Sequence, residues 1–279
     1  MSVLKIKDAD GNEKYLIVSG TGTSAKPFHS VSEDFLIAIE RGDVPGHDVI
    51  HKFGHNGAVP NGSYEFITDL GQTAHALSAA TTVRIKAGGN AADDTAGAGA
   101  REITIQGIDD NLNEITETIT TAGAAASAVT TALFWRVHRM WVSSVGTYGV
   151  ANTAAITLEN GTGGTDIIRI AATEGQTEDA IFTIPTGKTG YLLSAFITVD
   201  ANQDADIKIY TRGDINDTTA PMKSKRLKKH FTGVSENVNY NPRSPNTVLP
   251  ALTDIWVEAQ GGGGSTAVSA DLEILLIDD

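Results

Sequence analysis

The sequence predicts a mostly β protein, in which two antiparallel β-sandwich or jelly-roll-like domains follow an extended N-terminal arm. Runs of alternating apolar and polar residues recur at intervals of about 8–12 residues over most of the chain. Glycine fills 29 of the 279 positions, and together with abundant threonine it favours short strands joined by tight turns. No part of the chain alternates strands with long helices, which disfavours a nucleotide-binding α/β fold.

Residues 1–70 are predicted to form the arm. Val3–Lys7 and Tyr15–Val18 are strand-like runs on either side of a turn at residues 9–12, so we expect them to pair as a hairpin. Residues 31–41 have the pattern of a short helix or of an edge strand. Residues 43–63 are rich in Gly, Pro, Asn and His and lack apolar periodicity, so they are expected to be an extended segment that orders against another surface.

Residues 71–175 are predicted to form the first sandwich. Thr81–Ala87 alternates cleanly, and Ile103–Ile119 has the strongest hairpin pattern because alternating runs flank Asp109–Asn113, a cluster that tolerates turn conformations. Further strands are expected at Phe134–Ser143, Ala155–Glu159 and Ile167–Ala171. These runs are enough for a small sandwich.

Residues 176–279 are predicted to form the second sandwich or jelly roll, after a polar, turn-like boundary at residues 174–179. The alternating pattern places its strands at Ala180–Ile184, Gly190–Val199, Ala205–Thr211, His230–Tyr240, Asp254–Ala259 and Ala267–Ile277.

The strand that begins at Phe134 has no purely apolar face. In a regular strand one face carries Trp135, Val137, Arg139 and Trp141, and the other carries Phe134, Arg136, His138 and Met140. Two interpretations remain open: one face meets another chain, or arginines stack on bulky core residues.

The charge balance restricts the possible partners. The chain has 21 basic and 34 acidic residues, a net charge of −13, and phosphate backbones attract the opposite charge, so nucleic acid is not an expected partner. There is no cysteine, which excludes disulfides and thiolate metal sites. No stretch approaches the roughly 18 apolar residues that span a bilayer, and the first residues lack the apolar core of a secretory signal, so we expect no membrane insertion.

The sequence offers no convincing metal, cofactor or catalytic site. His47, His51 and His55 recur every fourth residue, but glycines flank and interrupt this segment, and in an extended chain such positions lie about 13 Å apart, too far to share a metal. Asp109–Glu114 begins like a calcium loop but lacks the required Gly and final Glu. No nucleophile elbow or phosphate-binding loop is recognisable. We therefore expect no catalytic residues, no metal, no cofactor and no enzymatic activity.

Two segments are candidates for binding a partner protein. The first contains His47, His51, Lys52, Phe53 and His55, whose side chains are expected to make hydrogen bonds and contacts at an interface. The second is a basic island at residues 223–230 in this acidic chain. It is interpreted either as a solvated loop between two strands or as an electrostatic contact with an acidic patch on a neighbouring subunit, made by Lys225, Arg226, Lys228 and Lys229.

Four stretches, in the same order, resemble a group of structural virion proteins of tailed bacteriophages, mainly short-tailed phages of aquatic bacteria. They are DVPGHDVIHKFGHN at 43–56, AREITIQGIDDNLNEITETI at 100–119, FTIPTGKTGY at 182–191 and LEILLIDD at 272–279. The resemblance covers most of the chain and implies a capsid-associated structural role. It offers no active-site residues.

The resemblance and the predicted fold together favour a capsid cement or decoration protein that binds and stabilises the head shell. Its expected partners are the major capsid protein or other virion proteins and further copies of itself, with a trimer favoured. Its expected location is the virion, assembled in the cytoplasm of the bacterial host. The alternatives are a tail component (an adaptor, a nozzle-associated protein or a fibre base) and, third, a module that binds host glycans.

Overall fold

The computed structural model describes residues 2–7, 13–19, 29–30, 35–71, 77–242 and 247–279. The described residues lie mostly in strands, with a single short helix, and the paired strands are antiparallel, which confirms the predicted mostly β, antiparallel fold. Among the described residues, no helix is both long and apolar enough to cross a bilayer.

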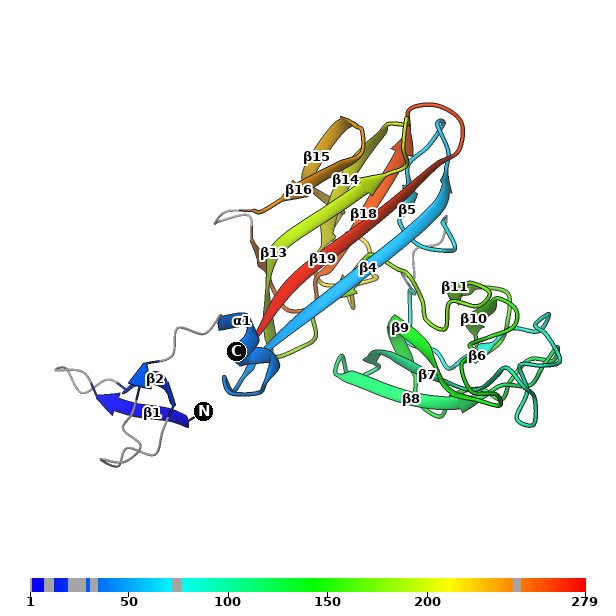
Figure 1. Cartoon of the computed structure of the whole chain (residues 1–279), viewed down its shortest axis with the longest axis horizontal. Helices are drawn as coiled ribbons and strands as arrows, with labels where there is room; N and C mark the ends of the chain where they lie inside the picture. The colour runs from blue at the N-terminus through cyan, green and yellow to red at the C-terminus, as the bar shows by residue number, and fades with distance from the viewer. Residues whose placement is uncertain (1, 8–12, 20–28, 31–34, 72–76, 243–246) are drawn as a thin grey trace.

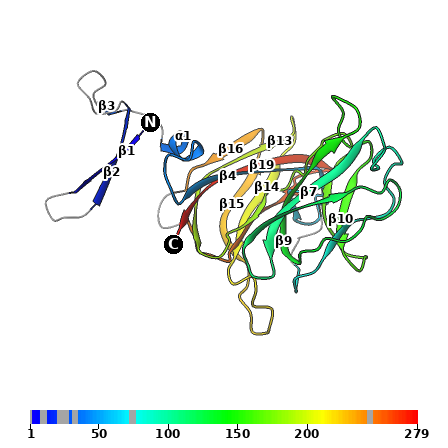
Figure 2. The same ribbon diagram turned by 90° about the horizontal axis from the view of Figure 1, so that it is seen from below.

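The N-terminal strands form a small sheet of their own. β1 (Ser2–Lys7), β2 (Glu13–Ser19) and β3 (His29–Ser30) pair in the order β1-β2-β3, which confirms the predicted hairpin. A short helix, α1 (Phe35–Glu40), follows; residues 31–34 of the predicted helix or edge strand lie outside the described residues. Figures 1 and 2 both show the small sheet apart from the rest of the molecule.

The smaller β unit comprises β6–β11. Its strands are β6 (Val83–Ile85), β7 (Ala100–Asp109), β8 (Glu114–Thr120), β9 (Phe134–Val145), β10 (Ile156–Asn160) and β11 (Asp166–Ile170). Two three-stranded sheets, β8-β7-β9 and β11-β10-β6, enclose one hydrophobic core. The predicted β7–β8 hairpin is confirmed, and its turn is held by Asp109, whose carboxylate accepts hydrogen bonds from the N–H groups of Asn111 and Asn113.

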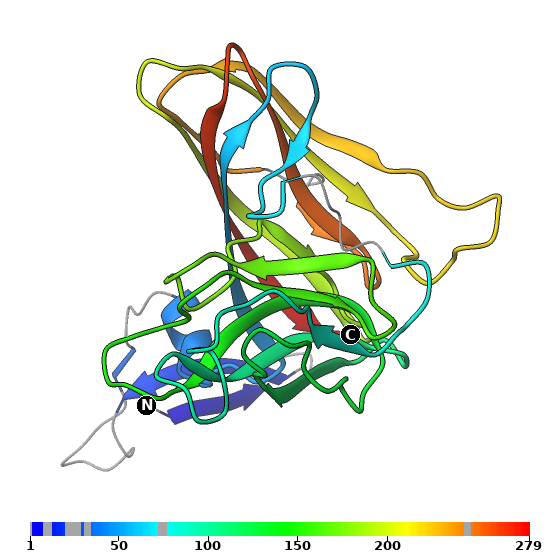
Figure 3. The ribbon, with the colours of Figure 1, turned by 90° about the vertical axis from the view of Figure 1, so that its right-hand side faces the viewer.

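The larger β unit comprises two five-stranded sheets. Its strands are β4 (His47–Val59), β5 (Glu65–Phe66), β12 (Ile181–Thr183), β13 (Lys188–Val199), β14 (Ala205–Arg212), β15 (Arg226–Val234), β16 (Asn237–Tyr240), β17 (Val248–Leu249), β18 (Asp254–Gly261) and β19 (Thr266–Asp278). One sheet has the order β16-β13-β19-β4, with β17 beside β13; the other has the order β12-β18-β14-β15, with β5 beside β18. A second hydrophobic core draws residues from both sheets, for example Ile197 and Val257. Figure 3 shows the larger unit above the smaller one.

The predicted arm over residues 43–63 was wrong. This segment contains β4, which pairs with β19 from His47 to Val59, and β5 follows at residues 65–66. The inward positions of β4 include Lys52, Gly54 and Asn56, which are buried but not apolar, so the strand lacks the alternating pattern by which buried strands are recognised. Residues 47–66 therefore belong with residues 181–278, and the smaller unit is inserted between β5 and β12.

The single strand predicted over His230–Tyr240 is two strands in different sheets. β15 pairs with β14 in one sheet, and β16 pairs with β13 in the other. Between them Glu236 has a φ of 68°, a left-handed conformation that ends one strand and turns the chain towards the opposite sheet.

Replacing Gly54 with alanine is expected to lower the free energy of unfolding by about 1–3 kcal/mol. A Cβ atom at this position would lie 2.2 Å from the carbonyl oxygen of Ile67 and 2.3 Å from the amide nitrogen of Ala180, and neither backbone atom is free to move. Gly57→Ala, on the same strand, is the control, because a Cβ there meets only the His55 ring at 3.4 Å. Urea denaturation measures both variants, and equal midpoints would contradict the close approach.

Candidate functional site

Strand β9 forms the junction between the two units. Register shifts in its pairing with β7 re-aim its side chains, so that Phe134, Val137 and Met140 all enter the core of the smaller unit. Arg136 and His138 are buried too, but their partners lie in the larger unit. The polar residues Arg136 and His138 on this strand therefore contact another part of the same chain.

The first junction contact is a buried ion pair between β9 and β18. The Arg136 guanidinium donates from Nε to Oδ1 of Asp254 at 3.2 Å and from its terminal nitrogen to Oδ2 at 3.1 Å. The hydroxyl of Thr183 donates to the same carboxylate at 2.6 Å. The remaining guanidinium donors reach the carbonyl oxygens of Leu77 and Trp135. Both charges are therefore paired and well hydrogen-bonded in a site from which water is excluded.

The second junction contact involves Lys52 of β4, Asp179 and His138. Lys52 is 4% exposed, and its ammonium group donates to the carbonyl oxygen of His138 at 2.5 Å. Burial lowers the pKa of Lys52 to about 8, although the charge of Asp179 opposes this shift. Burial raises the pKa of Asp179 to about 7, opposed by Lys52. The opposite charges of the two groups attract each other, but burial has the larger effect on both pKa values.

Aromatic contacts complete the junction. The ring of His138 packs against that of Phe182 with centroids 4.5 Å apart, and the guanidinium of Arg139 lies 5.5 Å from the ring centroid of Phe53. The Arg136–Asp254 ion pair, the hydrogen bond from Lys52 to the His138 carbonyl and these ring contacts tie β9 to β18, β4 and β12.

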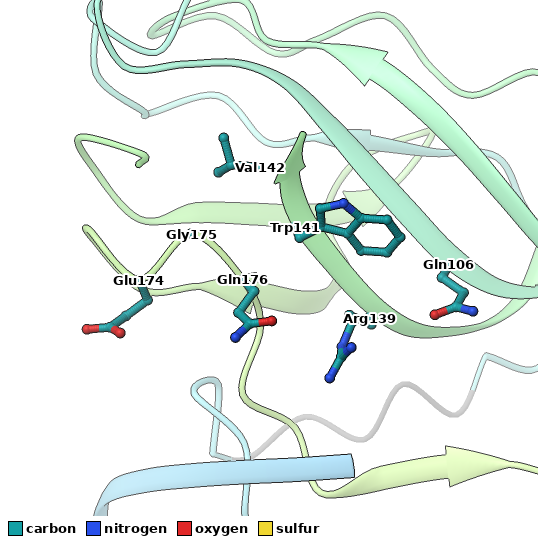
Figure 4. Close-up of a pocket in the computed structure, with 7 residues that line it drawn as sticks. All are labelled: Gln106, Arg139, Trp141, Val142, Glu174, Gly175 and Gln176. Atoms are coloured by element: carbon teal, nitrogen blue, oxygen red, sulfur yellow. The ribbon is translucent and has the colours of Figure 1, made fainter. Parts of the chain in front are cut away.

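A groove runs beside this junction. Figure 4 shows its widest hollow, about 470 Å³, where the side chains of Arg139, Trp141, Gln106 and Gln176 lie around one space. Two further hollows of about 290 and 300 Å³ continue along β4 towards α1. The walls are the polar outer face of the β8-β7-β9 sheet on one side and β4 on the other.

The predicted partner-binding residues of the first segment lie on two different faces of β4. His47, His51, Phe53 and His55 lie at alternate positions on one face of β4, where His51 faces Asp271 at 3.6 Å and His55 contacts the hydroxyl of Ser269 at 2.9 Å. Their role in binding a partner stays a prediction. Lys52 points the other way and is buried against β9, so its predicted contact with a partner is corrected to a contact within the chain.

The basic island is a loop only at residues 223–225, and from residue 226 onwards it is part of a strand. Arg226, Lys228 and Lys229 lie on β15, an edge strand, and Lys225 directly precedes it. Three of these four cations already have partners in the chain. Lys225 pairs with Glu258 at 3.0 Å, Lys228 donates to the carbonyl oxygen of Val248 at 3.2 Å, and Lys229 lies over the rings of Phe231 and Tyr240. Intramolecular contacts thus account for most of the island, and Arg226 is the cation most available to another molecule.

Sequence reasoning missed the roles of Asp179 and Asp254 in the junction. Asp179 lies in the segment that was interpreted as a polar, turn-like domain boundary, and Asp254 stands at the start of a strand, where a polar residue is ordinary. The only signal was the mixed character of the strand from Phe134, which left open whether one face meets another chain or arginines stack on bulky core residues.

The described residues contain no group of three or more His, Asp or Glu side chains arranged to hold a metal ion. The charged side chains at the junction bind one another, and the arrangement is suited to holding two β units together. The exception is Arg139, which faces the groove.

Comparisons with known proteins give little further information. No family model matches the chain, and no curated protein matches it. Among solved structures, it is similar to that of the infectious bursal disease virus Gt strain, with 10% identity, a TM-score of 0.22, and coverage of 89% of this chain and 75% of the other. The VP2 subviral particle of infectious bursal disease virus gives 10% identity, a TM-score of 0.21, and coverage of 89% and 74%. Similarity at this level does not establish a shared fold or function.

Proposed function

We propose that the chain is a structural protein of a virus particle, a cement or decoration protein that binds and stabilises the head shell of a tailed phage. The sequence resemblance to structural virion proteins supports this role, as does a body built from two tightly joined β units. The jelly-roll-like topology of the units, a trimeric state, contact with the major capsid protein and assembly in the bacterial cytoplasm belong to the same proposal.

The observation that carries the proposal is the position of the N-terminal sheet. β1, β2 and β3 lie apart from both units in two perpendicular views (Figures 1 and 2). A sheet this small is marginally stable unless it packs on another surface. A shell protein, or a neighbouring copy seated on the shell, would supply that surface, while the body projects outward.

Deleting residues 1–34 is expected to abolish incorporation into particles while leaving the body folded. The two hydrophobic cores, as far as the structure describes them, are built from residues 59–276, all of which the deletion keeps. Incorporation is measured by quantitative mass spectrometry of purified particles, and circular dichroism with thermal melting checks the fold. Normal occupancy of the shortened chain would contradict attachment through the N-terminal sheet.

Copy number tests the location. A decoration protein is expected to be present in many copies spread over the shell, whereas a tail component would form a single small ring. Electron cryomicroscopy of the particle distinguishes these outcomes, and density confined to the tail would replace the head assignment with the tail alternative.

A further inference from the structure

Strand β4 has an unpaired edge within the groove. It is the last strand of the sheet β16-β13-β19-β4, and the N–H of His55 points away from β19 to reach the carbonyl oxygen of Glu178 at 3.4 Å. Because backbone groups alternate in direction along an antiparallel strand, those of Val49 and His51 also point away from β19. In the part of the chain that the structure describes, no hydrogen bond satisfies them.

The place where the next strand would lie is hollow. Beside His55 it is filled by the segment around Glu178, but from Asp48 to Lys52 it opens into the two hollows of about 300 and 290 Å³. α1 closes one end of this slot through Ile39 and Glu40, and Arg139 lies at the other end. Four residue steps of extended chain need about 13 Å, so the slot accepts a short strand.

At the Arg139 end of the slot, the described residues give the guanidinium no ion-pair partner, although Glu40 lines the same hollow and Glu174 lines the neighbouring one. Nε of Arg139 is buried without a hydrogen-bond acceptor among the described residues. Its pKa is lowered by burial, and no neighbouring carboxylate offsets that shift. Lys52 adds a second positive charge that interacts with that of Arg139, and the carboxylate of Asp179 interacts with Lys52. The hollow nearer α1 is lined by Glu40, Asp48 and Glu114, of which Asp48 pairs with Lys188 at 2.9 Å and Glu40 also lines the hollow of Arg139. Arg139 is the cation of the slot without an ion-pair partner among the described residues, so a ligand's carboxylate is best placed there.

We propose that an extended segment of a partner protein adds to the edge of β4 between Asp48 and Lys52 and places an acidic side chain on Arg139. Backbone hydrogen bonds to Val49 and His51 supply affinity for any extended chain, and the bidentate guanidinium selects the carboxylate. The proposal rests on the slot and its charges, and it holds whether or not the chain is part of a virus particle.

The test uses the purified full chain and two fluorescein-labelled synthetic peptides, Thr-Val-Glu-Val-Thr and its twin with Gln in place of Glu. Fluorescence anisotropy is expected to show that the Glu peptide binds about tenfold more tightly, the usual contribution of a charge-assisted hydrogen bond. Arg139→Gln is expected to remove this difference while keeping the weaker binding. Val49→Pro is expected to abolish binding of both peptides, because it removes an outward N–H and leaves the ladder to β19 intact.

Arg226→Gln, which alters an exposed arginine outside the groove, is the matched control and is expected to bind like the wild type. Equal binding of the two peptides, binding unaffected by Val49→Pro, or no binding at millimolar peptide would each overturn the proposal. Sedimentation of the full chain tests another occupant. A dimer that becomes monomeric with either groove variant would assign the slot to a second copy and overturn the assignment to a different protein.

Discussion

Replacing Arg136 with methionine is expected to lower the free energy of unfolding by about 3–5 kcal/mol, the usual cost of removing one partner of a buried ion pair. Asp254 would remain buried with only the Thr183 hydroxyl as a donor from this site. Because Arg136 belongs to β9 and Asp254 to β18, the loss falls on the junction between the units. Urea denaturation followed by tryptophan fluorescence measures it.

The loss of free energy of unfolding should be much larger for Arg136, which is in a buried ion pair, than for an arginine on the surface. Arg226→Met is the control and is expected to change the free energy of unfolding by less than about 0.5 kcal/mol. The double variant Arg136→Met and Asp254→Asn is expected to recover much of the stability, since it leaves no unpaired charge. Similar midpoints for Arg136→Met and Arg226→Met would rule out a stabilising role of the pair at the junction.

Replacing Lys52 alone is expected to destabilise the protein, whereas replacing Lys52 and Asp179 together is not. Lys52→Met alone leaves Asp179 buried without its cation and is expected to cost about 3 kcal/mol or more. Lys52→Met combined with Asp179→Leu is expected to be at least as stable as the wild type, and up to about 4 kcal/mol more stable, because neither charge is favoured in this site. A double variant as unstable as the single one would show that the pair itself supports the fold.

The same pair predicts a pH dependence. The pKa of Asp179 is raised to about 7 in the folded protein, so the folded state keeps a proton that the unfolded chain releases near pH 4. The wild type should therefore lose stability relative to Asp179→Asn as the pH rises from about 4 to 7, by on the order of 1 kcal/mol per pH unit. Below about pH 4 both states carry the proton and this contribution is constant. A difference that grows on acidification instead would contradict the raised pKa.

The local part of the fold is readable from the sequence. The β7–β8 hairpin follows from alternation on both sides of a turn whose Asp109 side chain holds the backbone, and these interactions span only a few residues. The long strands β13 and β19 were predicted for the same reason, since each buries one face in a core and exposes the other.

The candidate site was less predictable, because its residues are brought together by pairing between strands that are far apart in the sequence. β4 is a strand because β19 is beside it, and its buried Lys52 and Gly54 serve contacts with β9 and with residues 67 and 180. No spacing in the sequence indicates that Arg136 meets a carboxylate 118 positions later. The histidine-rich segment was predicted as a binding segment, but the groove beside it also depends on Gln106, Arg139 and Trp141, which belong to the smaller unit.

The insertion of the smaller unit between β5 and β12 sets an order for folding during synthesis. The core of the smaller unit lies within residues 83–170, so this unit can fold soon after it leaves the ribosome. β4 emerges earlier but has to wait, because His55 pairs with Ser269, 214 residues further along. Throughout that delay an unpaired strand is exposed, which is the situation in which nascent chains aggregate or recruit chaperones.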